Sequence, residues 1–417
     1  MRIERLNISI SSDVRRVLLR PFEPTTSLRA QKILDRILSL SPQKVQKELE
    51  TILTDFENRH RNLKEYFLHR YSFKEKVLQI SRTLNMEQKL LIGAYFTMEY
   101  SPEAAALFNP SIVWHPKQER LTKNTRKFVL SLRATGEGHV SSLTFRSGII
   151  NSNFQIELDE PNRFLTSPEI KECENGYEAT FDTETDLADR IIFPNSSEES
   201  MGIEDARFVE FEDDSGNKSY YATYTAYDGK NIRQRMISSK DFIRFKIKNL
   251  NGKEIQNKGL ALFPRKVNGQ YAMLSRQDNE NNFIMFSDDI YTWNEKQLLM
   301  EPQYSWEFVQ LGNCGSPIET EQGWLIISHA VGALRKYVIT AFLLDLDDPT
   351  RVIGRLDRPL ISPNEDEREG YVPNVVYSCG SLLYKNKIII PYAMSDKASG
   401  FILVNLSDLW SNLIPTS

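Results

Sequence analysis

The residue types best suited to chemistry stand together in one short stretch, where Glu204, Asp205 and Arg207 lie within four consecutive positions. A polar loop precedes them and an apolar run typical of a β-strand follows. Side chains alternate between the two faces of a strand, so Asp205 and Arg207 are expected on one face and Glu204 on the other. Such a group forms either a structural ion pair or a positioned acid, and the rest of the chain must decide between the two.

Five apolar or aromatic segments after residue 101 each end in a polar side chain that could act on a ligand. The segments 128–133, 220–228, 271–276, 324–329 and 388–396 end in Arg133, Asp228, Arg276, His329 and Asp396. Strands that recur with turns between them over roughly 300 residues favour a β-propeller, whose inner strands surround a central channel. That arrangement would bring the five polar ends to one mouth. A pair of β-sandwiches is the alternative architecture.

The first hundred residues have a different pattern. From about residue 27 the apolar positions recur at helical spacing, and Ser41-Pro42 is typical of a helix start. We therefore expect an N-terminal α-helical appendage over 1–100 and an all-β domain over 101–417. The appendage carries no residue pattern that indicates chemistry, so packing or homo-oligomer contacts are its predicted role.

Composition excludes several classes of function. The 417 residues are 40% hydrophobic and 26% charged, as in ordinary globular proteins, and the net charge of −4 gives no basic footprint for nucleic acid. No run approaches the ~18 apolar residues of a membrane helix, and charges fill the N-terminus where a signal peptide would be apolar. We expect a cytoplasmic protein. Three cysteines and five histidines show no metal-ligand spacing, so neither a metal nor a cofactor is predicted.

The carboxylates suit the cleavage of a glycosidic bond. That reaction needs one carboxyl group that gives a proton and, when water is the acceptor, a second that activates it. Glu307 and the acidic loop 364–370 offer carboxylates besides Asp205. The acidic loop could equally be a solvated surface turn. No glycine-rich phosphate loop and no nucleophile elbow is found in the sequence.

A series of short motifs resembles one known family. The segments 202–207, 224–229, 239–242, 262–266, 306–307, 315–318, 323–326, 343–349 and 372–376 stand in the order seen in glycoside hydrolase family 130. The resemblance covers about 105–410. It implies a five-bladed β-propeller that acts on β-mannosides with inversion, either as a phosphorylase or as a hydrolase.

The resemblance also implies roles for individual residues. Asp205 matches the family's proton donor, which is thought to act through a hydroxyl of the bound mannose, and Ala206 replaces the usual proline. Asn109, Arg133 and Asp396 resemble sugar-binding positions. The remaining predicted substrate-binding residues are Glu204, Arg207, Asp228, Arg276, His329 and Asn374.

Two departures from the family pattern bear on the reaction. Neutral Gln310 replaces a lysine typical of the phosphorylases, and Ser328-His329-Ala330 replaces the usual Tyr-His-Gly. Because phosphate needs a cationic pocket, both changes favour an inverting β-mannosidase acting on β-1,2-linked manno-oligosaccharides, with Glu369 or Glu307 activating water. The alternatives are a phosphorylase that releases mannose 1-phosphate, with inorganic phosphate as co-substrate, and a non-catalytic carbohydrate-binding propeller.

Overall fold

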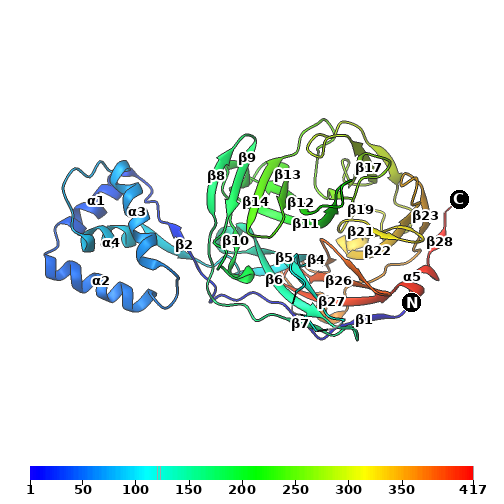
Figure 1. Cartoon of the computed structure of the whole chain (residues 1–417), viewed down its shortest axis with the longest axis horizontal. Helices are drawn as coiled ribbons and strands as arrows, with labels where there is room; N and C mark the ends of the chain where they lie inside the picture. The colour runs from blue at the N-terminus through cyan, green and yellow to red at the C-terminus, as the bar shows by residue number, and fades with distance from the viewer. Residues whose placement is uncertain (120, 123, 417) are drawn as a thin grey trace. The chain divides into compact units, whose positions relative to one another are not determined.

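The computed structural model describes residues 1–119, 121–122 and 124–416. The chain forms two compact units (Figure 1): a β unit of residues 1–12, 103–161 and 167–417, and a helical unit of residues 13–102 and 162–166. Residues 1–12 thus belong to the β unit, whereas the sequence predicts them in the helical appendage of residues 1–100. The reason is that strand β1 (Ile3–Arg5) pairs antiparallel with β27 (Ala398–Asn405), near the other end of the chain.

The helical unit contains α1 (Ser27–Leu38), α2 (Pro42–Phe56), α3 (Leu63–Val77) and α4 (Met86–Tyr95), and a two-stranded sheet of β2 (Leu18–Pro21) and β3 (Thr97–Tyr100). Side chains of Thr26, Ser41 and Asn85 cap the starts of α1, α2 and α4 by accepting backbone hydrogen bonds. None of the described helices is long and apolar enough to cross a membrane. A role in homo-oligomer contacts stays a prediction for this unit.

The largest sheet of the β unit has two parts. The first contains β4 (Ala106–Trp114), β5 (Arg126–Thr135), β6 (Ser141–Ile150), β7 (Ile156–Leu158) and β10 (Ile191–Ile192). The second contains β11 (Gly202–Glu212), β12 (Lys218–Tyr227), β13 (Ile232–Ser239), β14 (Arg244–Asn249), β9 (Gly176–Thr180) and β8 (Glu169–Cys173). A single parallel pair, Gly202 with Ser141, joins them, so they are effectively two strand groups.

Three further sheets complete the β unit. The third strand group is β15 (Ala261–Leu262), β16 (Tyr271–Ser275), β17 (Asn282–Ser287) and β18 (Gln297–Met300). The fourth is β19 (Gln310–Asn313), β20 (Ile318–Thr320), β21 (Gly323–Val331), β22 (Tyr337–Leu344), β23 (Val352–Arg355) and β28 (Ile414–Pro415). The fifth is β24 (Val376–Tyr377), β25 (Leu382–Tyr384), β26 (Lys387–Met394), β27 and β1, followed by the short helix α5 (Leu406–Trp410).

Buried apolar clusters join each strand group to the next. Phe145 of the first group packs with Phe208 and Phe245 of the second. The other clusters pair Phe211 and Met236 with Met273 and Trp293, Ile284 with Trp324 and Phe342, Leu325 and Ile339 with Ile388 and Ile402, and Phe128 and Leu130 with Ile389 and Phe401. The last cluster joins the fifth group to the first. Burial of these side chains is the main stabilising term of the unit.

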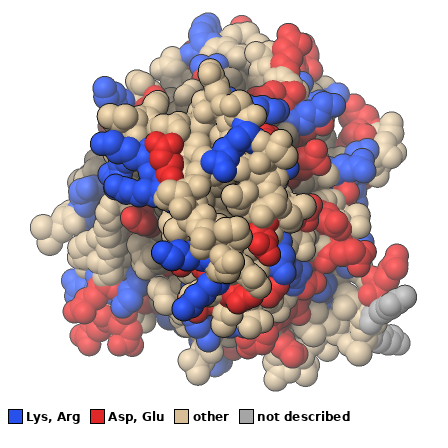
Figure 2. Space-filling view, turned by 90° about the vertical axis from the view of Figure 1, so that its left-hand side faces the viewer, with Lys and Arg blue, Asp and Glu red and all other residues tan. Residues whose placement is uncertain are grey.

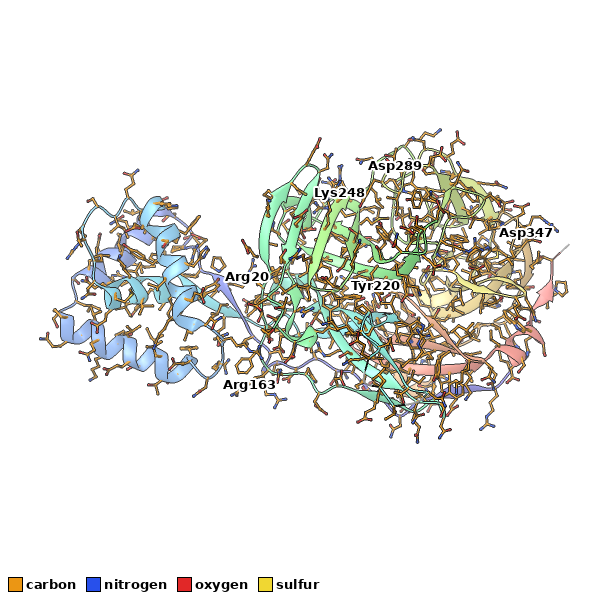
Figure 3. The ribbon with its side chains drawn as sticks, in the orientation of Figure 1. Arg20, Arg163, Tyr220, Lys248, Asp289 and Asp347 are labelled. Carbon is orange, nitrogen blue, oxygen red and sulfur yellow. The ribbon has the colours of Figure 1, made fainter. Side chains whose placement is uncertain are left out.

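Figure 2 shows the distribution of charged residues on one face of the molecule. On the face seen in Figure 2, basic and acidic side chains lie among one another over the described residues. Figure 3 shows Tyr220 among the packed side chains of the β unit, with Asp289 and Asp347 on loops at its periphery. This distribution agrees with the near-balanced composition and gives that face no single-sign field of the kind that binds nucleic acid.

Candidate active site

Side chains from all five strand groups converge on one pocket of about 230 Å³. Its lining consists of Asn109, Arg133, Asp205, Lys258, Arg276, Gln310, His329, Arg335, Tyr337, Val372, Val375, Tyr377 and Asp396. Four of the five predicted polar strand ends are among them: Arg133, Arg276, His329 and Asp396. The pocket thus combines two carboxylates with several cations, an arrangement that can bind a polar or anionic reactant and exchange a proton with it.

A β-bulge places Asp205 in this pocket. In the β11–β12 ladder Glu204 faces Thr225 and Arg207 faces Thr223, so one extra residue stands on β11. Asp205 itself has a left-handed backbone with φ of 54°. Such bulges bend a strand and re-aim its side chains. The expectation of strict alternation is therefore wrong here, because Glu204 and Asp205, predicted on opposite faces, both bond to Arg133.

Asn109 lies on a matching bulge of the first strand group. The β4–β5 register shifts between Phe108 and Ser111, and Asn109 has φ of 49°. Its side-chain Nδ2 donates a hydrogen bond of 2.7 Å to Oδ1 of Asp205. Strands β4 and β11 therefore share the same local distortion, and the side chains of Asn109 and Asp205 hold each other in place.

Arg133 links the two carboxylates of the β11 bulge. Its Nη2 lies 2.9 Å from Oε1 of Glu204, and its Nη1 lies 3.4 Å from Oδ1 of Asp205. The Nζ of Lys258 donates to the other Glu204 oxygen at 2.8 Å. Arg207 donates from Nη1 to the Asp205 carbonyl at 3.0 Å and from Nη2 to the Tyr377 hydroxyl at 2.5 Å. Glu204 and Arg207 thus hold the bulge in position from outside the pocket lining.

The two carboxyl groups in the pocket have different acidities. Burial by itself would raise the pKa of Asp205, but the charges of Arg133 and Arg207 and the hydrogen bond from Asn109 outweigh it, so this pKa is lowered. Burial, together with the negative charge of Asp205, raises the pKa of Asp396 to about 6. At neutral pH the empty pocket therefore holds an ionised Asp205 beside a carboxyl group that takes up a proton readily.

Arg276 and His329 line the pocket with buried nitrogens that have no hydrogen-bond partner, and the side-chain Oδ1 of Asn109 is also unpaired among the described residues. Among the described residues, Nε and Nη1 of Arg276 and Nδ1 of His329 are buried without a hydrogen-bond partner. Burial lowers the pKa of both side chains, and that of His329 falls well below its usual range, which keeps the imidazole neutral. Buried donors without partners are costly in a folded protein. They point to a polar ligand that completes their bonding.

Besides Glu204 and Arg207, four other predicted residues lie outside the pocket lining. Glu307 is fully buried and bonds Arg355 at 2.6 Å, and Glu369 is exposed on the acidic loop, so neither lines the pocket. The carboxylate of Asp228 caps its own turn by accepting from the amides of Lys230 and Asn231. Asn374 supports the pocket only indirectly, since its carbonyl accepts from the amide of Tyr337.

Several lining residues carried no signal in the sequence. Lys258 stands in an irregular loop before β15, and Arg335 ends a short 3-10 turn, Ala333–Arg335, after β21. Tyr337 is the first residue of β22, and Tyr377 is the second residue of β24. The one available clue was proximity to motifs: Tyr377 directly follows the matched segment 372–376, and Arg335 comes six residues after His329.

The chain is similar in sequence to several known proteins. A family model described as β-1,4-mannooligosaccharide phosphorylase matches residues 166–412. A 1,2-β-oligomannan phosphorylase of Thermoanaerobacter sp. (strain X514) is 34% identical over 227 residues, 53% of this chain and 74% of that protein. A β-1,2-mannobiose phosphorylase of the same strain is 31% identical over 281 residues, 64% of this chain and 87% of that protein.

A solved structure shares the fold. The β-1,2-mannobiose phosphorylase of Listeria innocua, in complex with β-1,2-mannobiose, aligns with a TM-score of 0.55. The alignment covers 74% of this chain and 92% of that one, at 20% sequence identity.

Proposed function

We propose, from the premise that the chain belongs to glycoside hydrolase family 130, that it is a phosphorylase of β-1,2-linked manno-oligosaccharides. The products would be mannose 1-phosphate, formed with inversion, and a chain shorter by one mannose. This reverses the preference for hydrolysis drawn from the sequence. The names of the two Thermoanaerobacter relatives support the substrate and the reaction.

The proposal also includes the fold: a five-bladed β-propeller with the pocket at the mouth of its channel. The support is the cycle of apolar clusters, in which every strand group packs against the next and the fifth against the first. Convergence of polar side chains from all five groups on one pocket is what such a channel would produce.

The observation that carries phosphorolysis is the unsatisfied guanidinium of Arg276. Its buried Nε and Nη1 lack partners in the described part of the chain, and a phosphate oxygen is the acceptor that a guanidinium binds best. Arg335 is a further cation in the same lining. Glu307 and Glu369, the glutamates predicted to activate water in a hydrolase, are absent from the described lining.

In the proposed reaction Asp205 supplies the proton. Mannose fills the pocket beside Asn109 and Arg133, and phosphate binds at Arg276. A phosphate oxygen forms the new bond to the anomeric carbon while the bond to the leaving oxygen on the opposite face breaks. The leaving oxygen takes a proton from Asp205, relayed through a mannose hydroxyl, and Asp205 regains one from solvent when the products leave.

The lowered pKa of Asp205 sets a condition on this step. The empty pocket favours the carboxylate, so the acid must become protonated when the substrates bind. Phosphate would bring negative charge close to Asp205, and the sugar would displace water from it. Both changes raise the pKa of a carboxyl group. Binding of the reactants would thus prepare the acid.

Hydrolysis is the second candidate, because Gln310 lines the pocket where the phosphorylases carry a lysine. Asp396 is then the carboxylate left to direct water, and an inverting pair requires a separation of roughly 6.5–9.5 Å from Asp205.

Product analysis separates the two reactions. Incubation of the protein with β-1,2-mannobiose should give mannose 1-phosphate in proportion to added phosphate. Asp205→Asn should lose at least about 10³-fold in kcat while the protein still folds. Free mannose formed at the same rate with and without phosphate would establish hydrolysis instead.

A further inference from the structure

The pocket is too small for an oligosaccharide. Its volume of about 230 Å³ lies below the roughly 300–1,000 Å³ of sites that enclose a drug-sized ligand. It can hold the sugar ring that reacts together with a small anion, so the remaining units of a longer chain must lie outside. The surface at the mouth of the pocket therefore has to provide any contacts that depend on chain length.

Two exposed rings are stacked beside that mouth. The centroids of the His139 and Tyr371 rings lie 5.4 Å apart, with 30° between the ring planes. Tyr371 is 66% exposed, although a phenol ring of this size usually finds burial. The pair comes from two loops that are remote in sequence, and each ring fixes the orientation of the other.

Backbone contacts connect both rings to the pocket. Tyr371 precedes Val372, which lines the pocket and donates its amide hydrogen to the carbonyl of Ser395 at 3.3 Å. Gly370, on the other side of Tyr371, lies so close to Ser395 that a Cβ would approach its carbonyl oxygen to 2.1 Å. Ser395 in turn precedes Asp396 of the lining. The tyrosine backbone is thus held one residue away from the pocket.

The strands β5 and β6, which flank the turn that contains His139, also place this residue near the pocket. It ends the 3-10 turn Glu137–His139 between β5 and β6, with a left-handed φ of 59°. The two strands carry Arg133 and Ser141, which bond each other at 2.8 Å at the edge of the pocket. The turn therefore leaves directly from the site, and its position relative to Asp205 is set by the sheet.

We propose that His139 and Tyr371 form a distal sugar-binding platform that holds a mannose unit beyond the scissile linkage and sets the preferred chain length. The C–H face of a pyranose ring packs on an aromatic face, and a ring that is already stacked loses little freedom when it binds. The inference rests on the proposed function for the identity of the sugar. It extends that function by placing preference for oligomers over the disaccharide in these two loops.

The test compares substrates of different length. For β-1,2-mannotetraose relative to β-1,2-mannobiose, the ratio of kcat/KM should fall about 3- to 10-fold in Tyr371→Ala. Tyr371→Phe, which keeps the stacked ring, should retain the wild-type ratio. His139→Ala should lower the ratio in the same direction. An unchanged ratio in Tyr371→Ala, or an equal loss in the Phe variant, would overturn the platform.

Calorimetric binding keeps the platform separate from the reaction. If the wild-type protein forms neither mannose 1-phosphate nor mannose, the proposed function fails, and the Kd of mannotetraose then decides. A Kd about 3- to 10-fold weaker in Tyr371→Ala than in wild type would sustain the platform. Equal Kd values, or no binding of mannotetraose by the wild type, would overturn it.

Discussion

Replacement of Arg276 by glutamine should separate binding from folding, because its guanidinium is poorly satisfied in the described structure. The side chain is 8% exposed, and two of its nitrogens have no hydrogen-bond partner among the described residues. Burial lowers its pKa, which indicates that the empty protein holds this charge at a cost. If phosphate is the missing partner, the substitution removes a binding contact and a folding penalty together.

The magnitudes follow from the unmade bonds. A hydrogen bond to a charged group contributes about 1.5–3 kcal/mol, so two such bonds from Arg276 to phosphate amount to about 3–6 kcal/mol. We take the lower end, since neighbouring contributions are not additive, and expect KM for phosphate to rise at least ~100-fold. The free energy of unfolding should stay the same or increase by about 1–3 kcal/mol, since a buried unpaired group is removed.

Arg355→Gln is the matched control. Its guanidinium is also buried, but it bonds Glu307 at 2.6 Å and does not line the pocket. Removing it leaves a buried carboxylate without its counter-charge, so the free energy of unfolding should drop by about 3–5 kcal/mol. KM for phosphate should change less than about twofold. Urea denaturation and phosphate-dependent kinetics measure both quantities. A less stable Arg276→Gln protein with normal KM for phosphate would refute the reasoning.

Three further predictions concern the same pocket. In urea titrations, Asp396→Asn should stabilise the protein by at most about 3 kcal/mol above pH 6 and have little effect near pH 4. The reason is that folding raises the pKa of Asp396 from 3.8 to about 6, so that ionisation of the carboxyl group opposes folding as the pH rises through that window. A stability difference that does not depend on pH would contradict this prediction. Gly312→Ala should lower kcat/KM at least ~10-fold, because the added Cβ would lie 2.4 Å from the His329 ring and force that ring to move. A crystal structure of the variant with the His329 ring in its original position would contradict this prediction. Gln310→Lys should lower KM for phosphate about 10-fold in initial-rate assays; no change would place phosphate away from this side chain.

The sequence predicted the strand ends better than the turns between them. Arg133, Arg276, His329 and Asp396 follow apolar runs with clear β periodicity, and the structure brings all four to one pocket. Asp228 follows an equally clear run but bonds the turn after it. Periodicity identifies where a strand ends, whereas the direction of the last side chain depends on local turn geometry.

The register of β11 and the hydrogen-bond partners of the glutamates could not be predicted from the sequence. Alternation separates Glu204 from Asp205, and only the bulge against β12 reunites them at Arg133. The sequence predicts Glu307 as a catalytic residue because it stands in the matched segment 306–307. Its actual partner, Arg355, is 48 positions away along the chain and has no pattern that connects the two. Long-range pairing of charges is a property of the folded packing, which local periodicity does not encode.

The pairing of β1 with β27 has a consequence for biosynthesis. Ile3 faces Val404, so β1 has to wait until about 400 further residues have been synthesised before its partner strand leaves the ribosome. The helical unit, whose contacts span mainly residues 13–102, can fold long before that. During synthesis the β unit therefore carries a folded helical unit between its segments while the pairing of β1 with β27 is still to form.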